Sequence, residues 1–222
     1  MRTNTTSNET IEMYLKTIAE LSDGRTPVVI ARVAERLGVT PVSANEMMKR
    51  LMEQGLITHE RYKGVNLTDN GRTYAYNVIR RQRLWECFLV EHLKIDWAAV
   101  YEISCRLEHA TSNVLAEALS AYLDHPTICP HGRAIPRPDG TLPKEIGQPL
   151  TELSVGQSGV IDSIQPTTTD IFAYLNRHQI LPDCKFKIVE VAPMDGPIMI
   201  ELDAGRVALG QSMAELIFVR TQ

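Results

Sequence analysis

The sequence lacks the features that mark membrane and secreted proteins. No apolar run approaches the roughly 20 residues that a membrane-spanning helix needs. Residues 1–8 are polar and rich in Thr and Asn, without the apolar stretch of a secretory signal. Internal repeats and low-complexity tracts are absent as well. We therefore expect a globular protein with no membrane contact.

Cysteine is scarce and scattered. The four cysteines are Cys87, Cys105, Cys129 and Cys184. They form no Cys-x-x-Cys pair, which excludes zinc-finger spacing and disfavours a disulfide scaffold. This usage favours a reducing, cytoplasmic location.

No segment is strongly basic, so the chain is not a polybasic nucleic-acid binder. The net charge is −4. Residues 1–74 nevertheless hold 10 Lys and Arg against 9 Asp and Glu, whereas residues 151–222 hold 5 against 9. Because the acid excess is mostly C-terminal, the N-terminal part can still meet phosphate groups.

Residues 28–74 carry the signals of a winged helix-turn-helix. A helix over 28–38 ends at Gly38, and Thr40-Pro41 caps and begins a second helix over 41–54, which Gly55 ends. Residues 56–68 predict a β-hairpin, and residues 68–71 cap a further helix. The expected buried residues of the second helix are Val42, Met47, Leu51 and Met52. A generic helical domain with an accidental hairpin is the alternative.

A winged helix-turn-helix places its second helix in the major groove of duplex DNA and its hairpin near the backbone. Asn45 can pair with adenine, and the basic side chains can contact phosphates. For each residue the alternative is an ordinary solvated face. The candidate DNA-binding residues are Thr40, Ser43, Asn45, Glu46, Lys49, Arg50, Arg61 and Lys63.

The helix before this unit carries one residue outside its core stripe. We expect Ser7 or Asn8 to cap the helix, which runs to about Leu21. Met13 lies about 200° around the helix from Ile11. It is either a surface contact or a soft thioether ligand. The core stripe comprises Ile11, Leu15, Ile18 and Leu21.

Two apolar helices are predicted after the winged unit, over 72–94 and 96–123. Such a pair commonly forms a homodimer, which suits a palindromic operator, although it can also complete an intramolecular core. Gln82 and Glu86 share one face of the first helix at i and i+4.

The second of these helices presents a metal half-site. Cys105, Glu108 and His109 stand at i, i+3 and i+4, so a thiol, a carboxylate and an imidazole share one face. The alternative is a small buried cysteine beside a solvated Glu-His pair. The expected core stripe, on roughly the opposite side, is Val100, Ile103, Leu107, Val114 and Ala118.

A Pro/Gly-rich loop follows and contains His125, Cys129 and His131. No acidic or further Cys/His partner follows at ligand spacing, so we interpret it as a constrained loop and not as a second metal site.

The C-terminal part predicts a small β-barrel. Strand-like segments cover 159–164, 185–191, 198–202, 205–208 and 216–220, with a short helix at 170–178. The predicted fold class is therefore α+β. The expected domains are a winged helix-turn-helix over 1–74, a helical dimerisation and metal-binding domain over 75–147, and an SH3-like barrel over 148–222.

These motifs resemble the diphtheria toxin repressor family of iron- and manganese-dependent transcriptional repressors. The resemblance covers nearly the whole chain. It rests on the segments 10–15 (TIEMYL), 34–37 (AERL), 51–56 (LMEQGL), 83–86 (RLWE), 107–109 (LEH) and 129–136 (CPHGRAIP).

The resemblance implies two metal sites. The family's activating site uses a Met, a Cys, a Glu and a His, which correspond to Met13, Cys105, Glu108 and His109. Its ancillary site uses a Glu, matched by Glu86, and two His. Those two positions look to be Gln82 and Tyr101, so we expect this site to be weakened, altered or absent; Asp170 is a further candidate ligand.

The resemblance implies a metal-activated, dimeric, DNA-binding repressor that is not an enzyme. Mixed N, O and S donors suit Fe²⁺, with Mn²⁺ the alternative effector and Co²⁺, Ni²⁺ or Zn²⁺ as surrogates. Three other interpretations compete. They are a winged-helix regulator of a non-metal signal with a structural metal, a thiol enzyme using Cys105 and His109, and an iron-handling accessory protein acting through the barrel.

Overall fold

The computed structural model describes residues 3–22, 24–143 and 147–221. The chain divides into two compact units. Unit 1 comprises Met1–Arg81 and Pro136–Leu142, and unit 2 comprises Gln82–Ile135 and Pro143–Gln222. In the part of the chain that the structure describes, no helix combines the length and the apolar character needed to cross a membrane.

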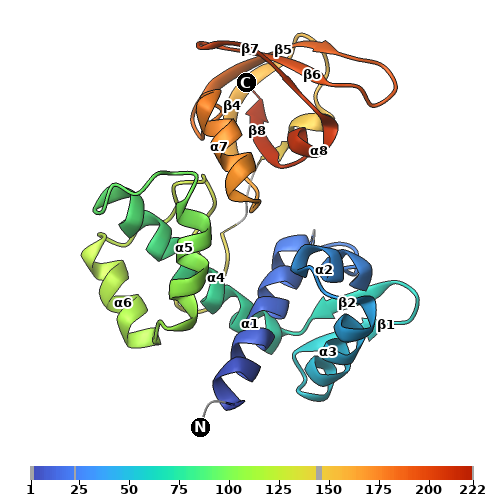
Figure 1. Ribbon diagram of the computed structural model, residues 1–222, viewed down its shortest axis with the longest axis vertical. Helices are drawn as coiled ribbons and strands as arrows, with labels where there is room; N and C mark the ends of the chain where they lie inside the picture. Colours follow the sequence, from blue (N-terminus) through green and yellow to red (C-terminus); the bar gives the residue numbers. More distant parts are fainter. Residues whose placement is uncertain (1–2, 23, 144–146, 222) are drawn as a thin grey trace. The chain divides into compact units, whose positions relative to one another are not determined.

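Unit 1 is a winged helix-turn-helix, as predicted (Figure 1). Its helices are α1 (Thr3–Leu21), α2 (Ile30–Leu37), α3 (Pro41–Glu53) and the first part of α4 (Asp69–Glu91). Strands β1 (Ile57–Glu60) and β2 (Gly64–Leu67) pair antiparallel as the wing. A Cβ atom on Gly64 would lie 2.2 Å from the Val28 carbonyl oxygen, so this close approach requires glycine.

Two details of unit 1 differ from prediction. Helix α1 already begins at Thr3, so Ser7 and Asn8 lie inside the helix and do not cap it. On α3, Val42 and Met52 are exposed, and the buried residues are Ala44, Met48 and Leu51. The apolar residues of α3 fit more than one helical face, and contacts with α2 select the face that is buried.

The helical part of unit 2 contains the second half of α4, together with α5 (Val100–His109) and α6 (Asn113–Tyr122). The single helix predicted over 96–123 is therefore wrong. Ser112 caps α6 by accepting a hydrogen bond from the Leu115 N–H at 3.2 Å, and this restarts the helical phase. On α6 the predicted core stripe fails for the same reason: Val114 is 83% exposed, whereas Val100 of the stripe is buried on α5 as predicted. The buried residues are Val100, Ser104 and Glu108 on α5, and Ala116, Leu119 and Ser120 on α6.

The C-terminal part of unit 2 is the predicted small barrel. Its antiparallel sheet has the order β3-β8-β4-β5-β6-β7, and Figure 1 shows α7 beside the strands. The sheet and α7 enclose an apolar core that includes Phe172, Leu175 and Ile188. The elements are β3 (Gln148–Pro149), η1 (Leu150–Glu152), β4 (Ser158–Ile164), α7 (Thr169–Arg177), β5 (Lys185–Val191), β6 (Ile198–Leu202), β7 (Gly205–Leu209), α8 (Gln211–Ala214) and β8 (Ile217–Thr221).

Candidate metal centre and DNA-binding surface

Three buried side chains of unit 2 converge in what we call the loop cluster: Glu86, Cys129 and His131. Their ligand atoms all lie within 4.8 Å of one another. Glu86 comes from α4, and Cys129 and His131 come from the loop that follows α6. The His131 Nδ1 atom lies 3.2 Å from Glu86 Oε2. A carboxylate, a thiol and an imidazole at this separation could hold one divalent metal ion.

The backbone of the loop fixes these ligands. Cys129 donates an N–H to the Arg133 carbonyl at 2.9 Å, and Gly132 donates an N–H to the Cys129 carbonyl at 2.8 Å. Gly132 has a φ of 80°, and a Cβ there would lie 2.1 Å from the Asp162 carbonyl oxygen of β4. Only glycine fits this turn, so the loop can lie directly against the barrel. A hydrogen bond from the Ile164 N–H to the His131 carbonyl, 2.9 Å long, joins the loop to β4.

Aromatic rings enclose the other side of His131. Its ring centroid lies 4.4 Å from that of Phe172 on α7 and 4.7 Å from that of Trp97. Tyr101 packs edge-on against His131, at 6.5 Å between ring centroids. The barrel thus contributes an aromatic ring to this cluster, whereas Asp170 lies exposed in the first turn of α7.

Burial and neighbouring charges have opposite effects on the pKa of Glu86, and burial and the charge of Glu86 act together on the pKa of Cys129. Burial alone would raise the pKa of Glu86, but the His131 imidazole, hydrogen bonds from His131 and Cys129, and the Arg83 guanidinium hold that pKa below its usual range. Burial raises the pKa of Cys129 well above its usual range, and the negative charge of Glu86 adds to this rise. A metal ion here would therefore have to displace the thiol proton.

The loop cluster corrects one conclusion drawn from the sequence. The segment around Cys129 and His131 is indeed constrained, but it does have an acidic partner. Glu86 stands more than 40 residues earlier, on α4, and the loop folds back to reach it. Spacing within the loop could not reveal this partner. The Cys129-Pro130-His131 motif, which places two potential ligands on either side of one proline, was the one signal in the loop of a possible site.

Helix α5 carries the α5 cluster, which comprises Cys105, Glu108 and His109. Glu108 is 1% exposed, and Cys105 and His109 are half-buried. The His109 Nε2 atom lies 3.9 Å from Glu108 Oε1. The three residues occupy one side of α5 because of their spacing, as predicted. Met13 lies on α1 in unit 1, with 45% of its surface exposed.

Gln82 lies between the two clusters of unit 2. Its Nε2 atom donates to Glu86 Oε1 at 3.1 Å and to Cys105 Sγ at 3.3 Å. Gln82 is therefore a hydrogen-bond donor to two candidate ligands in this structure, with its amide nitrogen and not its carbonyl oxygen facing Glu86.

The candidate DNA-binding residues lie on α3, its cap and the wing. Thr40 caps α3, its Oγ1 accepting from the Ser43 N–H at 3.2 Å. Asn45 donates to the Pro41 carbonyl at 2.7 Å, so its amide is partly engaged within its own helix. Lys63 pairs with Glu60 at 3.2 Å near the tip of the wing. The remaining candidates, Glu46, Lys49, Arg50 and Arg61, are exposed.

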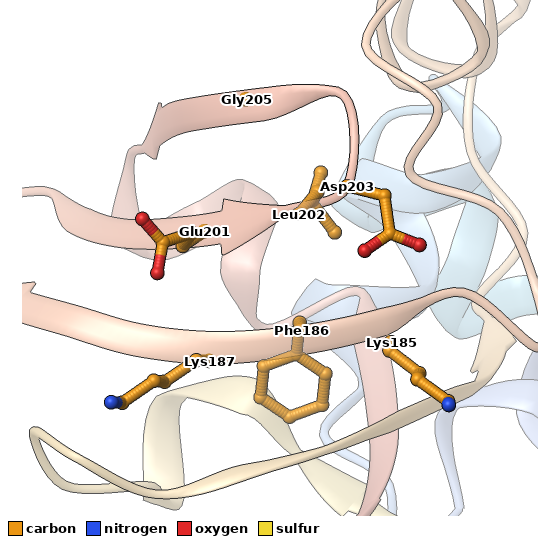
Figure 2. Close-up of a pocket in the computed structure, with 7 residues that line it drawn as sticks. All are labelled: Lys185, Phe186, Lys187, Glu201, Leu202, Asp203 and Gly205. Atoms are coloured by element: carbon orange, nitrogen blue, oxygen red, sulfur yellow. The ribbon is translucent and has the colours of Figure 1, made fainter.

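The barrel has a pocket of about 470 Å³ lined by β5, the end of β6 and the turn to β7 (Figure 2). Phe186 and Leu202 line it together with the charged residues Lys185, Lys187, Glu201 and Asp203. Two basic and two acidic side chains leave it without a dominant charge, and it contains none of the residues of the two clusters.

Family comparisons match all three parts of the chain. A model described as the iron dependent repressor N-terminal DNA binding domain matches residues 7–65, and its metal binding and dimerisation domain matches residues 68–137. A FeoA domain matches residues 148–221. The iron-dependent repressor IdeR of Mycobacterium leprae is 30% identical, covering 95% of this chain and 96% of its own. The chain belongs to the diphtheria toxin repressor family.

Other relatives and solved structures agree with this family membership. The diphtheria toxin repressor of Corynebacterium diphtheriae is 28% identical over 94% of this chain and 96% of its own. A manganese-dependent transcriptional repressor in complex with manganese superposes with a TM-score of 0.86 and 33% identity, over 96% of this chain and all of that one. The structure of ScaR with bound Zn²⁺ superposes with a TM-score of 0.84 and 29% identity, over 96% of this chain and 99% of that one. Membership of the diphtheria toxin repressor family identifies unit 1 as the DNA-binding part.

Proposed function

We propose that this protein is a cytoplasmic, dimeric transcriptional repressor whose binding to operator DNA requires a divalent metal ion. The observation that carries the proposal is the pair of ligand clusters in unit 2. Both lie within or beside helices of the segment that matches the metal binding and dimerisation domain. The expected targets are genes for metal-ion homeostasis.

The activating ion is proposed to bind to Met13 and to the α5 cluster. A thioether, a thiol, a carboxylate and an imidazole form a mixed donor set that suits Fe²⁺, with Mn²⁺ as the alternative. Because these donors come from both units, an ion bound to all four would restrict how unit 1 and unit 2 are arranged. That restriction would favour the DNA-binding state over other states.

A second ion is proposed to bind at the loop cluster. Its three side chains fit a metal because they offer N, O and S donors within 4.8 Å. Glu86 is the residue that the loop cluster shares with the ancillary site expected from the sequence. Gln82 and Asp170 are at most weak ligands in this proposal, since Gln82 donates hydrogen bonds and Asp170 is exposed.

Dimerisation is proposed to use the exposed apolar surface of unit 2. The rings of Phe88, His92 and Tyr122 pack together, with 4.9 Å between the centroids of His92 and Tyr122. Large exposed apolar residues there include Leu93, Val114, Leu115 and Tyr122. A dimer would present two copies of α3 to a palindromic operator.

The deciding experiment is anaerobic DNA binding measured by fluorescence anisotropy. The duplex would come from the region upstream of the protein's own gene. Fe²⁺, Mn²⁺ and Zn²⁺ would be titrated separately, each with a chelator control. We expect binding that needs metal and is reversed by the chelator. The Cys105→Ala and His109→Ala proteins should fold normally and lose the metal-stimulated part of DNA binding. Binding that is equal with and without chelator would instead favour a regulator of a non-metal signal.

A further inference from the structure

A single buried amide joins the two clusters of unit 2. Gln82 is 2% exposed and stands one turn before Glu86 on α4. One Nε2 atom donates to a carboxylate oxygen of the loop cluster and to the sulfur of the α5 cluster. The connection continues from Glu86 to His131, and from His131 Nε2 to the Trp97 carbonyl at 3.2 Å.

The orientation of this amide follows from its partners. A primary amide nitrogen carries two hydrogens, which suffice for one bond to Glu86 and one to Cys105. Turning the amide over would direct its carbonyl oxygen at the Glu86 carboxylate, which can only accept, whereas a thiol can donate or accept. The carboxylate of Glu86 therefore sets the donor orientation of the amide, and the same nitrogen then donates to Cys105 Sγ.

We propose that Gln82 is a positioning residue that couples metal binding at the two clusters, so that filling the loop cluster strengthens binding at the α5 cluster. This inference rests on the proposed function, because it takes both clusters to be metal sites. A metal ion at the loop cluster would fix the carboxylate of Glu86, which in turn fixes Gln82. The Gln82 N–H would then hold Cys105 Sγ in place before the second ion arrives.

Direct electrostatics predicts the opposite sign. Two divalent cations in one unit repel each other, which would make a filled loop cluster weaken the α5 cluster. That repulsion does not depend on the side chain at position 82. Both the sign of the coupling and its dependence on Gln82 therefore separate the two explanations.

The test is to measure how Zn²⁺ protects Cys105 from alkylation. The protein is titrated anaerobically with Zn²⁺ and treated with iodoacetamide, and mass spectrometry of its peptides quantifies modification at Cys105 separately from the other cysteines. His131→Gln disables the loop cluster. In the protein that keeps Gln82, we expect this substitution to raise the Zn²⁺ concentration for half-protection by about fivefold or more.

The same comparison is then made in Gln82→Met and Gln82→Leu proteins. These side chains have no donor, so His131→Gln should now change the midpoint by less than about twofold. Thr111→Val is the matched control. It removes a part-buried hydrogen bond between α4 and the segment after α5, from Trp85 Nε1 to Thr111 Oγ1 at 2.7 Å, together with the bond from Thr111 Oγ1 to the Leu107 carbonyl at 2.7 Å. It should leave the coupling intact.

Each outcome decides one point. Coupling of equal size in the parent, Gln82→Met and Gln82→Leu proteins, or no coupling in the parent protein, would overturn the role of Gln82 while the proposed function stands. A parent protein in which Zn²⁺ gives Cys105 no protection would overturn the proposed metal site on α5 itself. Thermal unfolding of every variant verifies that the comparisons are made between folded proteins.

Discussion

His131 holds the loop cluster together through both ring nitrogens, the face of its ring and its backbone carbonyl. One ring nitrogen faces Glu86 and the other faces the Trp97 carbonyl. The ring itself lies against Phe172, and its carbonyl accepts from Ile164 of β4. The residue is 2% exposed. It therefore has a structural role even without a metal ion.

Replacing His131 with Ala should destabilise the metal-free protein. The substitution leaves the buried carboxylate of Glu86 without its imidazole partner and opens space beside Phe172. We expect the free energy of unfolding to fall by about 3 kcal/mol. Urea unfolding with chelator present measures this. In the His131→Gln protein, whose side chain can still form hydrogen bonds, the free energy of unfolding should fall by less. An equal fall in both proteins would mean that packing alone explains the effect.

Metal binding at the loop cluster should depend on pH through Cys129. Because burial raises the pKa of this thiol, it carries its proton at neutral pH, and a bound metal must release that proton. In a Cys105→Ala background, Zn²⁺ affinity should rise about tenfold per pH unit between about pH 7 and 8.5. Competition with a coloured chelator measures the affinity. Cys129→Ser should flatten the slope; an unchanged slope would remove Cys129 from the ligand set.

Residue patterns predicted local groupings of ligands but not groupings that tertiary folding creates. Cys105, Glu108 and His109 share a helix face because of their spacing alone. Cys129 and His131 acquire Glu86 only when the loop turns at Gly132 and packs between α4 and β4. Because Glu86 and the loop are far apart in the sequence, no periodicity could predict that they come into contact.

At the level of elements, two helix caps share one geometry but should differ in function. Thr40 caps α3, and Ser112 caps α6, each accepting a backbone N–H at 3.2 Å. Thr40→Ala and Ser112→Ala should each cost about 1 kcal/mol of stability, measured by chemical unfolding. Only Thr40→Ala should also weaken DNA binding, because α3 is the proposed recognition helix. Equal losses of DNA affinity would show that the effect is one of general stability.

Elements with strong local signals were predicted well. Gly38 ends α2 in the left-handed conformation at a φ of 65°, and Thr40-Pro41 begins α3 as expected. The break between α5 and α6 was missed because residues 110–112 contain neither Gly nor Pro. Ser112 caps a new helix there. Because the break was not predicted, the helical periodicity of α5 was extended across it into α6, and the wrong face of α6 was expected to be buried.

At the level of the whole molecule, the exposed apolar surface of α6 should control assembly. Val114 is 83% exposed and Tyr122 is 64% exposed. Val114→Asp should shift the proposed dimer to monomer by placing a charge in the proposed interface, with the fold retained. Sedimentation equilibrium measures the mass. Met194, which is 97% exposed on the barrel, is the control position, and Met194→Asp should remain dimeric. A dimeric Val114→Asp protein would exclude this surface.

The boundary between the units falls between two adjacent residues of α4, and this decides what a change in the length of that helix would alter. Arg81 pairs with Glu12 of α1 at 2.6 Å within unit 1, and Gln82 joins the two clusters of unit 2. One residue inserted between them would turn the following helix by about 100° and advance it by about 1.5 Å. Each of the two contacts lies within its own unit, so both would be kept. A change of length at this point of α4 therefore alters the helical phase between the two contacts and not the contacts themselves.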